Sequence, residues 1–392
     1  MPRNPPFIQN AQKQASEFVN KHESKFLYKI LLDILNICFI MKPSAGEPAG
    51  HHIPNEWMPN RYITLFSEGG NNMKKAIVSA ALAAMMGVMA VGSTVMAEAE
   101  LLPGGGTKIL YCITPSTSNP FFGTEQVIAK EVGEELGYEV KCFSHDDDAA
   151  TQLELFEAAV TDKAAAIICD NAGADASIEA IQKAYDAGIP TFLIDREINQ
   201  TGLAISQIVA DNAQGAAAIA EVWVEAMNYE GKYAELLGLE SDTNCQVRSD
   251  NYHSVIDEYP DLEMVAQQSA NWDQTEAYEK TEAILQANPE ITGIICGNDT
   301  MACGAVQACI DAGRDDIKII GLDGSDDAAN YIKSGDMVGT ALQQIALITE
   351  TAVREADDYL NGTAPEEEKQ LVPCIAITAD NVENLSAFVF TE

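Results

Sequence analysis

Short runs of apolar, β-branched residues alternate with helical patterns along most of this chain, and this alternation limits the fold more than any other feature. A regular strand–helix–strand order favours a parallel sheet with helices on both faces. The alternation passes through one series of strands and then begins again with the helix expected over 214–227. Two series predict an α/β protein built from two doubly wound parallel-sheet lobes.

The expected strands are short and apolar, and the expected helices carry apolar residues at helical spacing. We expect strands at 108–114, 138–144, 164–170, 191–196, 204–210, 232–239, 263–269, 292–298, 316–323, 337–343 and 371–378. We expect helices at 124–136, 149–163, 176–188, 214–227, 245–258, 275–287, 301–312, 325–333 and 345–360.

A different composition precedes this region. Two Lys in MKK at 73–75 are followed by about twenty apolar or small residues, and small residues at 95–97 or 97–99 suit a signal peptidase. This pattern is typical of a cleaved signal peptide over 73–97. The absence of Cys near the cleavage point argues against a lipoprotein anchor, and a transmembrane anchor is the alternative interpretation.

A signal peptide belongs at the N-terminus of a protein, yet residues 1–72 precede this one. The segment SEGGNNM at 67–73 can be encoded by codons that contain GGAGGT, a ribosome-binding sequence at suitable spacing from the ATG of Met73. We therefore expect translation to start at Met73 and residues 1–72 to be translated upstream DNA without a fold. The alternative is a genuine N-terminal extension.

Charge and cysteine content exclude several classes of function. Asp and Glu number 60 against 23 Lys and Arg, which gives a net charge of −37, so the chain would repel the phosphates of nucleic acid. Nine Cys without a C-x-x-C pair, together with only five His, argue against a zinc site. Cys often pair outside the cytoplasm, but Cys112, Cys142, Cys169 and Cys296 lie in apolar strand-like runs. We expect mostly free, buried thiols.

Polar and aromatic residues recur where the expected strands end, which is the edge where parallel sheets bind ligands. The first series supplies Asn119, Phe121, Phe122, Asp170, Asn171, Asp195 and Arg196, and the second supplies Arg248, Trp272, Asn298, Asp323 and Gln343. Carboxylates, amides and guanidinium groups hydrogen-bond to hydroxyls, and flat rings cover C–H faces. The set therefore suits an uncharged, polyhydroxylated ligand.

Individual members of this set have a purely structural interpretation as well. Asn and Asp that follow strands often cap helices, which would account for Asp299, Asp326 and the acidic run at 146–148. Phe121 and Phe122 would also suit a hydrophobic core. The recurrence at nearly every strand end is what favours a binding site.

The order and spacing of five motifs resemble the ribose-type periplasmic sugar-binding proteins, which are substrate-binding components of ABC importers with the type I periplasmic-binding fold. The resemblance extends over 108–392 and rests on SNPFF at 118–122, IDRE at 194–197, VRSDNYH at 247–253, GNDTMACGA at 297–305 and GLDGSDD at 321–327. It implies that one monosaccharide or polyol binds between two lobes joined by a hinge of three crossovers. No cofactor or metal ion is expected.

By this resemblance the residues have separate roles toward the sugar. Phe121 and Phe122 would stack on its ring, Asp170 and Asn171 are further candidates, and the hydrogen-bonding set would be Asn119, Asp195, Arg196, Arg248, Asn298, Asp323 and Gln343. Trp272 stands where the ribose binder has Phe, and Leu322 where it has another aromatic residue. These departures favour another pentose, a branched aldose or a sugar alcohol over ribose.

The resemblance also implies the domain organisation. Crossovers near 210–211, 343–344 and 372–373 would divide the chain into lobe one, at 105–210 plus 344–372, and lobe two, at 211–343 plus 373–392. Sugar bound to both lobes would stabilise a closed form. That form would dock, as a monomer in the periplasm or another extracytoplasmic space, on the membrane permease of an ABC importer.

Two other classes of function fit the sequence less well. A sugar- or quorum-signal-sensing protein of the same fold, feeding a chemoreceptor or kinase, is the alternative to transport. An enzyme is not expected, because only His145 and His253 follow the signal segment and no Ser-His-Asp, Cys-His or metal-binding set is readable.

Overall fold

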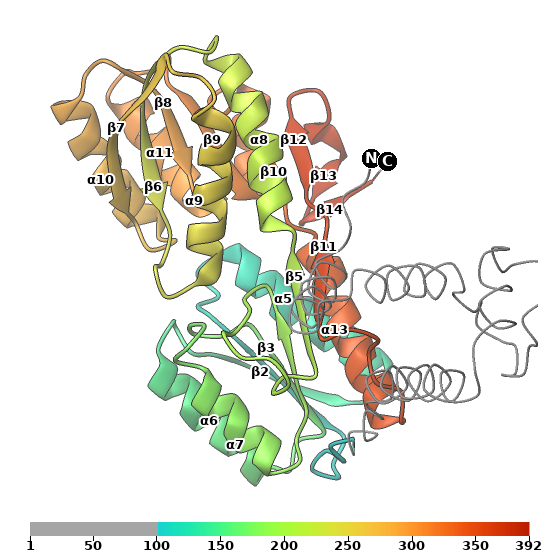
Figure 1. The fold of residues 1–392 in the computed structure, drawn as a ribbon. Coiled ribbons are helices and arrows are strands. Elements are labelled where there is room, and N and C mark those ends of the chain that lie inside the picture. Colours follow the sequence, from blue (N-terminus) through green and yellow to red (C-terminus); the bar gives the residue numbers. More distant parts are fainter. Residues whose placement is uncertain (1–100, 392) are drawn as a thin grey trace, which may run out of the picture. The chain divides into compact units, whose positions relative to one another are not determined.

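A computed structural model describes residues 101–391, which contain two six-stranded sheets with helices on both faces of each (Figure 1). The α/β class predicted from the sequence is confirmed. The predictions for 1–72 and 73–97 lie outside the described residues. No helix within 101–391 has the length and apolar character needed to cross a membrane.

The first sheet has the order β11-β5-β4-β3-β1-β2, and all of its strand pairs are parallel. Its strands are β1 (Ile109–Thr114), β2 (Glu139–Ser144), β3 (Ala166–Cys169), β4 (Thr191–Ile194), β5 (Ser206–Ala210) and β11 (Lys369–Val372). Its helices are α5 (Pro120–Glu135), α6 (Ala149–Thr161), α7 (Ile178–Asp186) and α13 (Ile345–Leu360). Helices α6 and α7 pack together on one face, and α5 and α13 pack together on the other.

The second sheet has the order β12-β10-β9-β8-β6-β7. Its strands are β6 (Gly231–Leu237), β7 (Leu262–Ser269), β8 (Ile291–Cys296), β9 (Lys318–Asp323), β10 (Gly339–Leu342) and β12 (Ile375–Thr378). Its helices are α8 (Asn212–Ala226), α9 (Thr243–Ile256), α10 (Gln274–Ala287), α11 (Asp299–Asp311) and α12 (Asp326–Ser334). Helices α8 and α9 pack together, and so do α10 and α11. Because crossovers between parallel strands are right-handed, the two helix pairs cover opposite faces of this sheet.

The chain changes sheets between β5 and α8, between β10 and α13, and between β11 and β12. The single strand expected at 371–378 is therefore two strands. Pro373 separates them, because proline lacks the N–H that would continue the ladder. One strand pair departs from the parallel arrangement, since β12 runs antiparallel to β10.

Helix α5 begins at Pro120, four residues before the start predicted from its apolar pattern. The Asn119 side chain accepts a hydrogen bond from the backbone N–H of Phe121 at 3.0 Å, and proline suits the first helical position. This capped start places Phe121 and Phe122 in the first turn of the helix.

The segment after β12 forms a 3₁₀ turn (Val382–Asn384) and a small hairpin of β13 (Leu385–Ser386) and β14 (Val389–Phe390). The hairpin places the ring of Phe388 edge-on against that of Phe121, with ring centres 5.5 Å apart. The C-terminal residues therefore support an aromatic side chain of α5.

A buried carboxylate in the second sheet is paired with a histidine. Glu235 of β6 is 1% exposed, and one of its oxygens lies 3.0 Å from Nε2 of His253 and accepts a 2.6 Å hydrogen bond from Gln267. The hydrogen bond with Glu235, opposed by burial, raises the pKa of His253 to about 9. The folded protein therefore holds a proton on His253 that the unfolded chain loses near its ordinary pKa.

Replacing His253 with Gln should remove a pH-dependent part of the free energy of unfolding. Because the folded-state pKa is raised, the stabilisation is complete below the unfolded value of about 6.5 and is lost as the pH rises through about 9. Urea unfolding of both proteins should show a stability difference at pH 6 that shrinks above pH ~9. An equal difference at both pH values would contradict this assignment.

Candidate functional site

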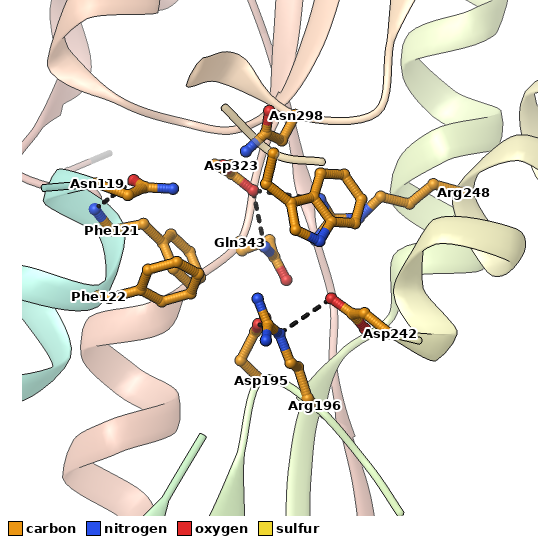
Figure 2. A pocket seen from close by; sticks show the side chains of 11 residues that line it. Asn119, Phe121, Phe122, Asp195, Arg196, Asp242, Arg248, Asn298, Asp323 and Gln343 are labelled. Atoms are coloured by element: carbon orange, nitrogen blue, oxygen red, sulfur yellow. Dashed lines mark hydrogen bonds and ion pairs between the residues drawn. The ribbon is translucent and has the colours of Figure 1, made fainter. Parts of the chain in front are cut away.

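The carboxyl-end edges of the two sheets meet at a polar cavity with about 230 Å³ of empty space, counted with its opening. Its lining consists of Asn119, Phe121, Phe122, Asp195, Arg196, Asp242, Arg248, Trp272, Asn298, Asp323 and Gln343. Ten of the twelve residues predicted from the sequence are among them (Figure 2).

Arg196, just after β4, is 1% exposed and surrounded by carboxylates. Its Nε lies 3.0 Å from Asp242 and 3.4 Å from Asp170, and its Nη1 donates a 2.7 Å hydrogen bond to Asp147. Burial lowers the pKa of this guanidinium, but Asp170 and then Asp242 outweigh burial and raise it above the ordinary value. The charge on Arg196 is therefore held in place, and the pair with Asp242 joins the two sheets, as Figure 2 shows.

A second buried guanidinium comes from α9 on the other side of the cavity. Arg248 donates to the Asn212 side chain at 2.8 Å and to the carbonyl of Gly297 at 2.9 Å. Its Nη1 lies 3.4 Å from Asp323, which also accepts a 2.9 Å hydrogen bond from Gln343 (Figure 2). These contacts orient the Arg248 guanidinium, the Asp323 carboxylate and the Gln343 amide around the same cavity.

Aromatic rings provide the apolar part of the cavity. The rings of Phe121 and Phe122 lie edge to face with centres 5.5 Å apart. Each guanidinium also faces a ring, with Arg196 lying 5.3 Å from the centre of Phe122 and Arg248 lying 5.2 Å from that of Trp272. Such cation–π contacts fix both the rings and the charged groups.

Close approach of the backbone to Trp272 requires glycine. A Cβ atom at Gly238 would overlap the indole ring, and one at Gly297 would come within 2.8 Å of it. The indole therefore lies flat against backbone at the ends of β6 and β8. No larger residue at Gly238 fits without moving the ring.

Three residues of the lining have backbone conformations that side chains disfavour. The φ angles are 57° for Asp195, 63° for Trp272 and 144° for Asp323. Each such residue costs on the order of 1–3 kcal/mol, and such strain clusters at functional sites. The strain aims these three side chains from the strand ends into the cavity.

Several buried polar atoms of the lining have no hydrogen-bond partner among the described residues. Apart from Nε of Arg196, which is ion-paired with Asp242 at 3.0 Å, they are Oδ1 of Asp195, Oε1 of Gln343 and Nε1 of Trp272. Burial, with a further contribution from Asp242, raises the pKa of Asp195 to about 6. Unpartnered buried groups are costly, so this set of two acceptors and one donor is matched to a ligand that both donates and accepts.

Asp170 and Asn171, the other two predicted residues, lie behind the lining. Asp170 is wholly buried against Arg196, and the Asn171 side chain donates to the carbonyl of Arg196 at 2.8 Å. Both hold Arg196 in place. Leu322 is buried within β9 and is absent from the lining, so it gives no information on the ligand.

Sequence reasoning missed Asp242 and Glu125. Asp242 caps α9 by accepting from the backbone N–H of Asn244, and its place after β6 was the available signal. Glu125 is fully buried in α5, its oxygens have no partner among the described residues, and burial raises its pKa well above the ordinary value. Nothing in the local pattern of α5 marks Glu125 as exceptional.

Curated relatives match most of the described chain. A D-apiose import binding protein of Actinobacillus succinogenes is 52% identical over 282 residues, which cover 71% of this chain and 91% of that protein. A second D-apiose import binding protein, from Paraburkholderia graminis, is 48% identical and covered over 90% of its length. A ribose import binding protein of Bacillus subtilis is 30% identical over 66% of this chain and 84% of its own.

The fold has close counterparts among solved structures. An ABC transporter periplasmic solute binding protein of Actinobacillus succinogenes with bound D-allose superimposes with a TM-score of 0.67 and 29% identity, over 70% of this chain and 99% of that one. The family model described as periplasmic binding protein domain matches residues 110–364. The resemblance and the type I periplasmic-binding fold predicted from the sequence are confirmed, and this chain belongs to the periplasmic binding protein family.

Proposed function

We propose that this chain binds D-apiose, a branched aldopentose, in the cavity between its two sheets and delivers it to the permease of an ABC importer. The observation that carries the proposal is a small cavity lined with hydroxyl-binding groups and aromatic rings from both sheets. Two relatives named D-apiose import binding proteins, 52% and 48% identical to this chain, support D-apiose as the proposed ligand. The relatives are transport proteins, which fits a binding role without catalysis.

The unpartnered atoms suggest how a neutral sugar is recognised. Sugar hydroxyls would donate to Oδ1 of Asp195 and Oε1 of Gln343 and accept from Nε1 of Trp272. The rings of Phe121, Phe122 and Trp272 would cover C–H faces, as in sites where aromatic surface supplies contact area.

We propose the predicted lobes, 105–210 plus 344–372 and 211–343 plus 373–392, as the two moving parts. The ligand favours a closed arrangement only to the extent that it binds that arrangement more tightly than the open one. The pair of Arg196 with Asp242 and the 3.2 Å hydrogen bond from the Asn244 side chain to the carbonyl of Asp195 already span the two parts. Sugar bound between them would add to these bridges, and the closed monomer would dock on the permease.

Asp195→Asn should abolish most sugar binding and leave the fold intact. Burial disfavours the carboxylate, so the neutral amide is tolerated, but it removes the negative charge and leaves one acceptor oxygen in place of two. Hydrogen bonds to charged groups contribute about 1.5–3 kcal/mol, which predicts ~10- to 100-fold weaker binding. Calorimetry and thermal shift with D-apiose, D-ribose and xylitol would measure this, with exposed Asp186→Asn as the control.

The same sugar panel tests the proposed ligand. D-apiose should raise the melting temperature of the wild-type protein more than the other sugars at equal concentration. A larger shift with D-ribose or xylitol would reject D-apiose, and unchanged affinity in Asp195→Asn would reject the site. Arg196→Ala is a poorer test, because it would leave Asp147, Asp170 and Asp242 facing one another without their cation.

Gly238→Ala should weaken sugar binding without touching the sugar, because the added methyl group displaces the ring of Trp272. Overpacking costs about 1–3 kcal/mol of folding free energy, and displacement of the indole relieves it, so the Kd for the sugar should rise several-fold. Gly123→Ala in α5 is the matched control, since its Cβ would meet only the Thr117 carbonyl oxygen, at 3.9 Å. Equal affinities of the two variants, measured by calorimetry, would show that Trp272 is not a sugar contact.

We also propose that residues 73–97 are a cleaved signal peptide and that translation starts at Met73, in keeping with relatives that are periplasmic binding proteins. Intact-mass and N-terminal peptide analysis of the native protein should find Glu98 or Glu100 as the first residue. A mature chain that retains residues from 1–72 would contradict both parts of this proposal.

A further inference from the structure

Cys112 and Cys142 are direct neighbours in the first sheet. Residue 112 of β1 and residue 142 of β2 are paired in the parallel register, and adjacent strands lie ~4.7–4.9 Å apart. Both side chains pack against the same apolar cluster, on the face covered by α5. A disulfide requires Cα atoms about 4.4–6.8 Å apart and side chains that point the same way, and this pair meets both conditions.

Cys142 is the accessible member of the pair. It lies on β2, the edge strand of the sheet, and is half-buried, whereas the other seven cysteines of residues 101–391 are buried. A hydrogen bond with the Cys112 thiol lowers the pKa of Cys142 below its ordinary value, while burial opposes this. The same contact and burial raise the pKa of Cys112. Cys142 is therefore the thiol that an oxidant reaches and that ionises first.

Two other strand cysteines, Cys169 and Cys296, have no cysteine as a register partner. Cys169 of β3 is paired with Ile113, not with Cys112, and packs in the cluster on the opposite face of the sheet. Cys296 lies within β8 of the second sheet, where its register partner on β6 is Leu236. One bonded pair would leave six thiols, in keeping with the expectation of mostly free cysteines.

We propose that Cys112 and Cys142 form a disulfide when the chain is exported to an oxidising compartment. The oxidant is a small-molecule or protein disulfide. The Cys142 thiolate attacks one of its sulfurs and expels a thiolate, and the Cys112 thiolate then attacks Sγ of Cys142 and expels the second. The two cysteines lose two protons and two electrons, and the oxidant becomes two thiols. The inference rests on the proposed export of this chain, not on the identity of the sugar.

The bond would tie together the two strands that flank α5 in the sequence. That helix carries Asn119, Phe121 and Phe122 of the cavity, and the Sγ of Cys142 already lies 3.6 Å from the backbone oxygen of Gln126 in the same helix. Closing a loop of this size restrains the unfolded chain and stabilises the folded one. The disulfide would therefore stabilise the position of β1, β2 and α5, which support the site, without entering the cavity.

The experiment compares the full exported protein before and after reduction. Protein isolated under acid conditions, alkylated with N-ethylmaleimide and digested without reductant should yield the peptides of Cys112 and Cys142 joined. Reduction should lower the melting temperature by about 4 °C or more, and oxidised glutathione should restore it. The proposal would be overturned if Cys112 and Cys142 were found alkylated and unlinked in the protein as isolated and also after treatment with oxidised glutathione.

Two cysteine variants test whether the redox-dependent shift in melting temperature comes from this pair. Cys142→Ser removes a half-buried thiol and should abolish both the linked peptide and the redox-dependent shift, whereas Cys169→Ala, the matched control on β3, should keep both. A redox shift that persists in Cys142→Ser would overturn the assignment. D-apiose stabilisation measured on the same samples separates the proposals, since loss of the sugar response with the linked peptide present rejects only the ligand.

Discussion

The buried charge of Arg196 organises this molecule. Its guanidinium lies among Asp147, Asp170 and Asp242, and the contact with Asp242 connects the first sheet to the second. Removing one member of a buried ion-pair network leaves an uncompensated charge, which is strongly destabilising. The cavity therefore depends on one cation that fixes the position of Phe122, orients the carboxylates and bridges the parts proposed to move.

The polar groups of the cavity are arranged before any sugar arrives. Asp195, Trp272 and Asp323 have disfavoured φ angles, and Asp195, Gln343 and Trp272 each bury an atom without a partner among the described residues. Both features cost free energy of folding. A ligand that satisfies these atoms recovers part of that cost, which is the physical basis of affinity in a preorganised site.

Much of the site was predictable because parallel sheets bring the carboxyl ends of their strands to one edge. Asp195, Asn298, Asp323 and Gln343 could be placed there from the strand pattern alone. Helix ends were harder: the apolar period of α5 hid its start at Pro120, where the cap of Asn119 decides the boundary. Asp242 was missed because the apolar pattern placed the start of α9 at 245, whereas the helix begins at Thr243 with Asp242 as its cap.

The sequence by itself determined the α/β class, the two strand series and the polar residues at the strand ends, since these follow from local periodicity and composition. Only the tertiary structure decided that Asp170 and Asn171 stand behind Arg196 while Asp242 faces the cavity. It also decided that Cys112 lies beside Cys142 and that Gly238 lies beneath Trp272. Such contacts join residues distant in the chain, and packing and register, which no local pattern encodes, select them.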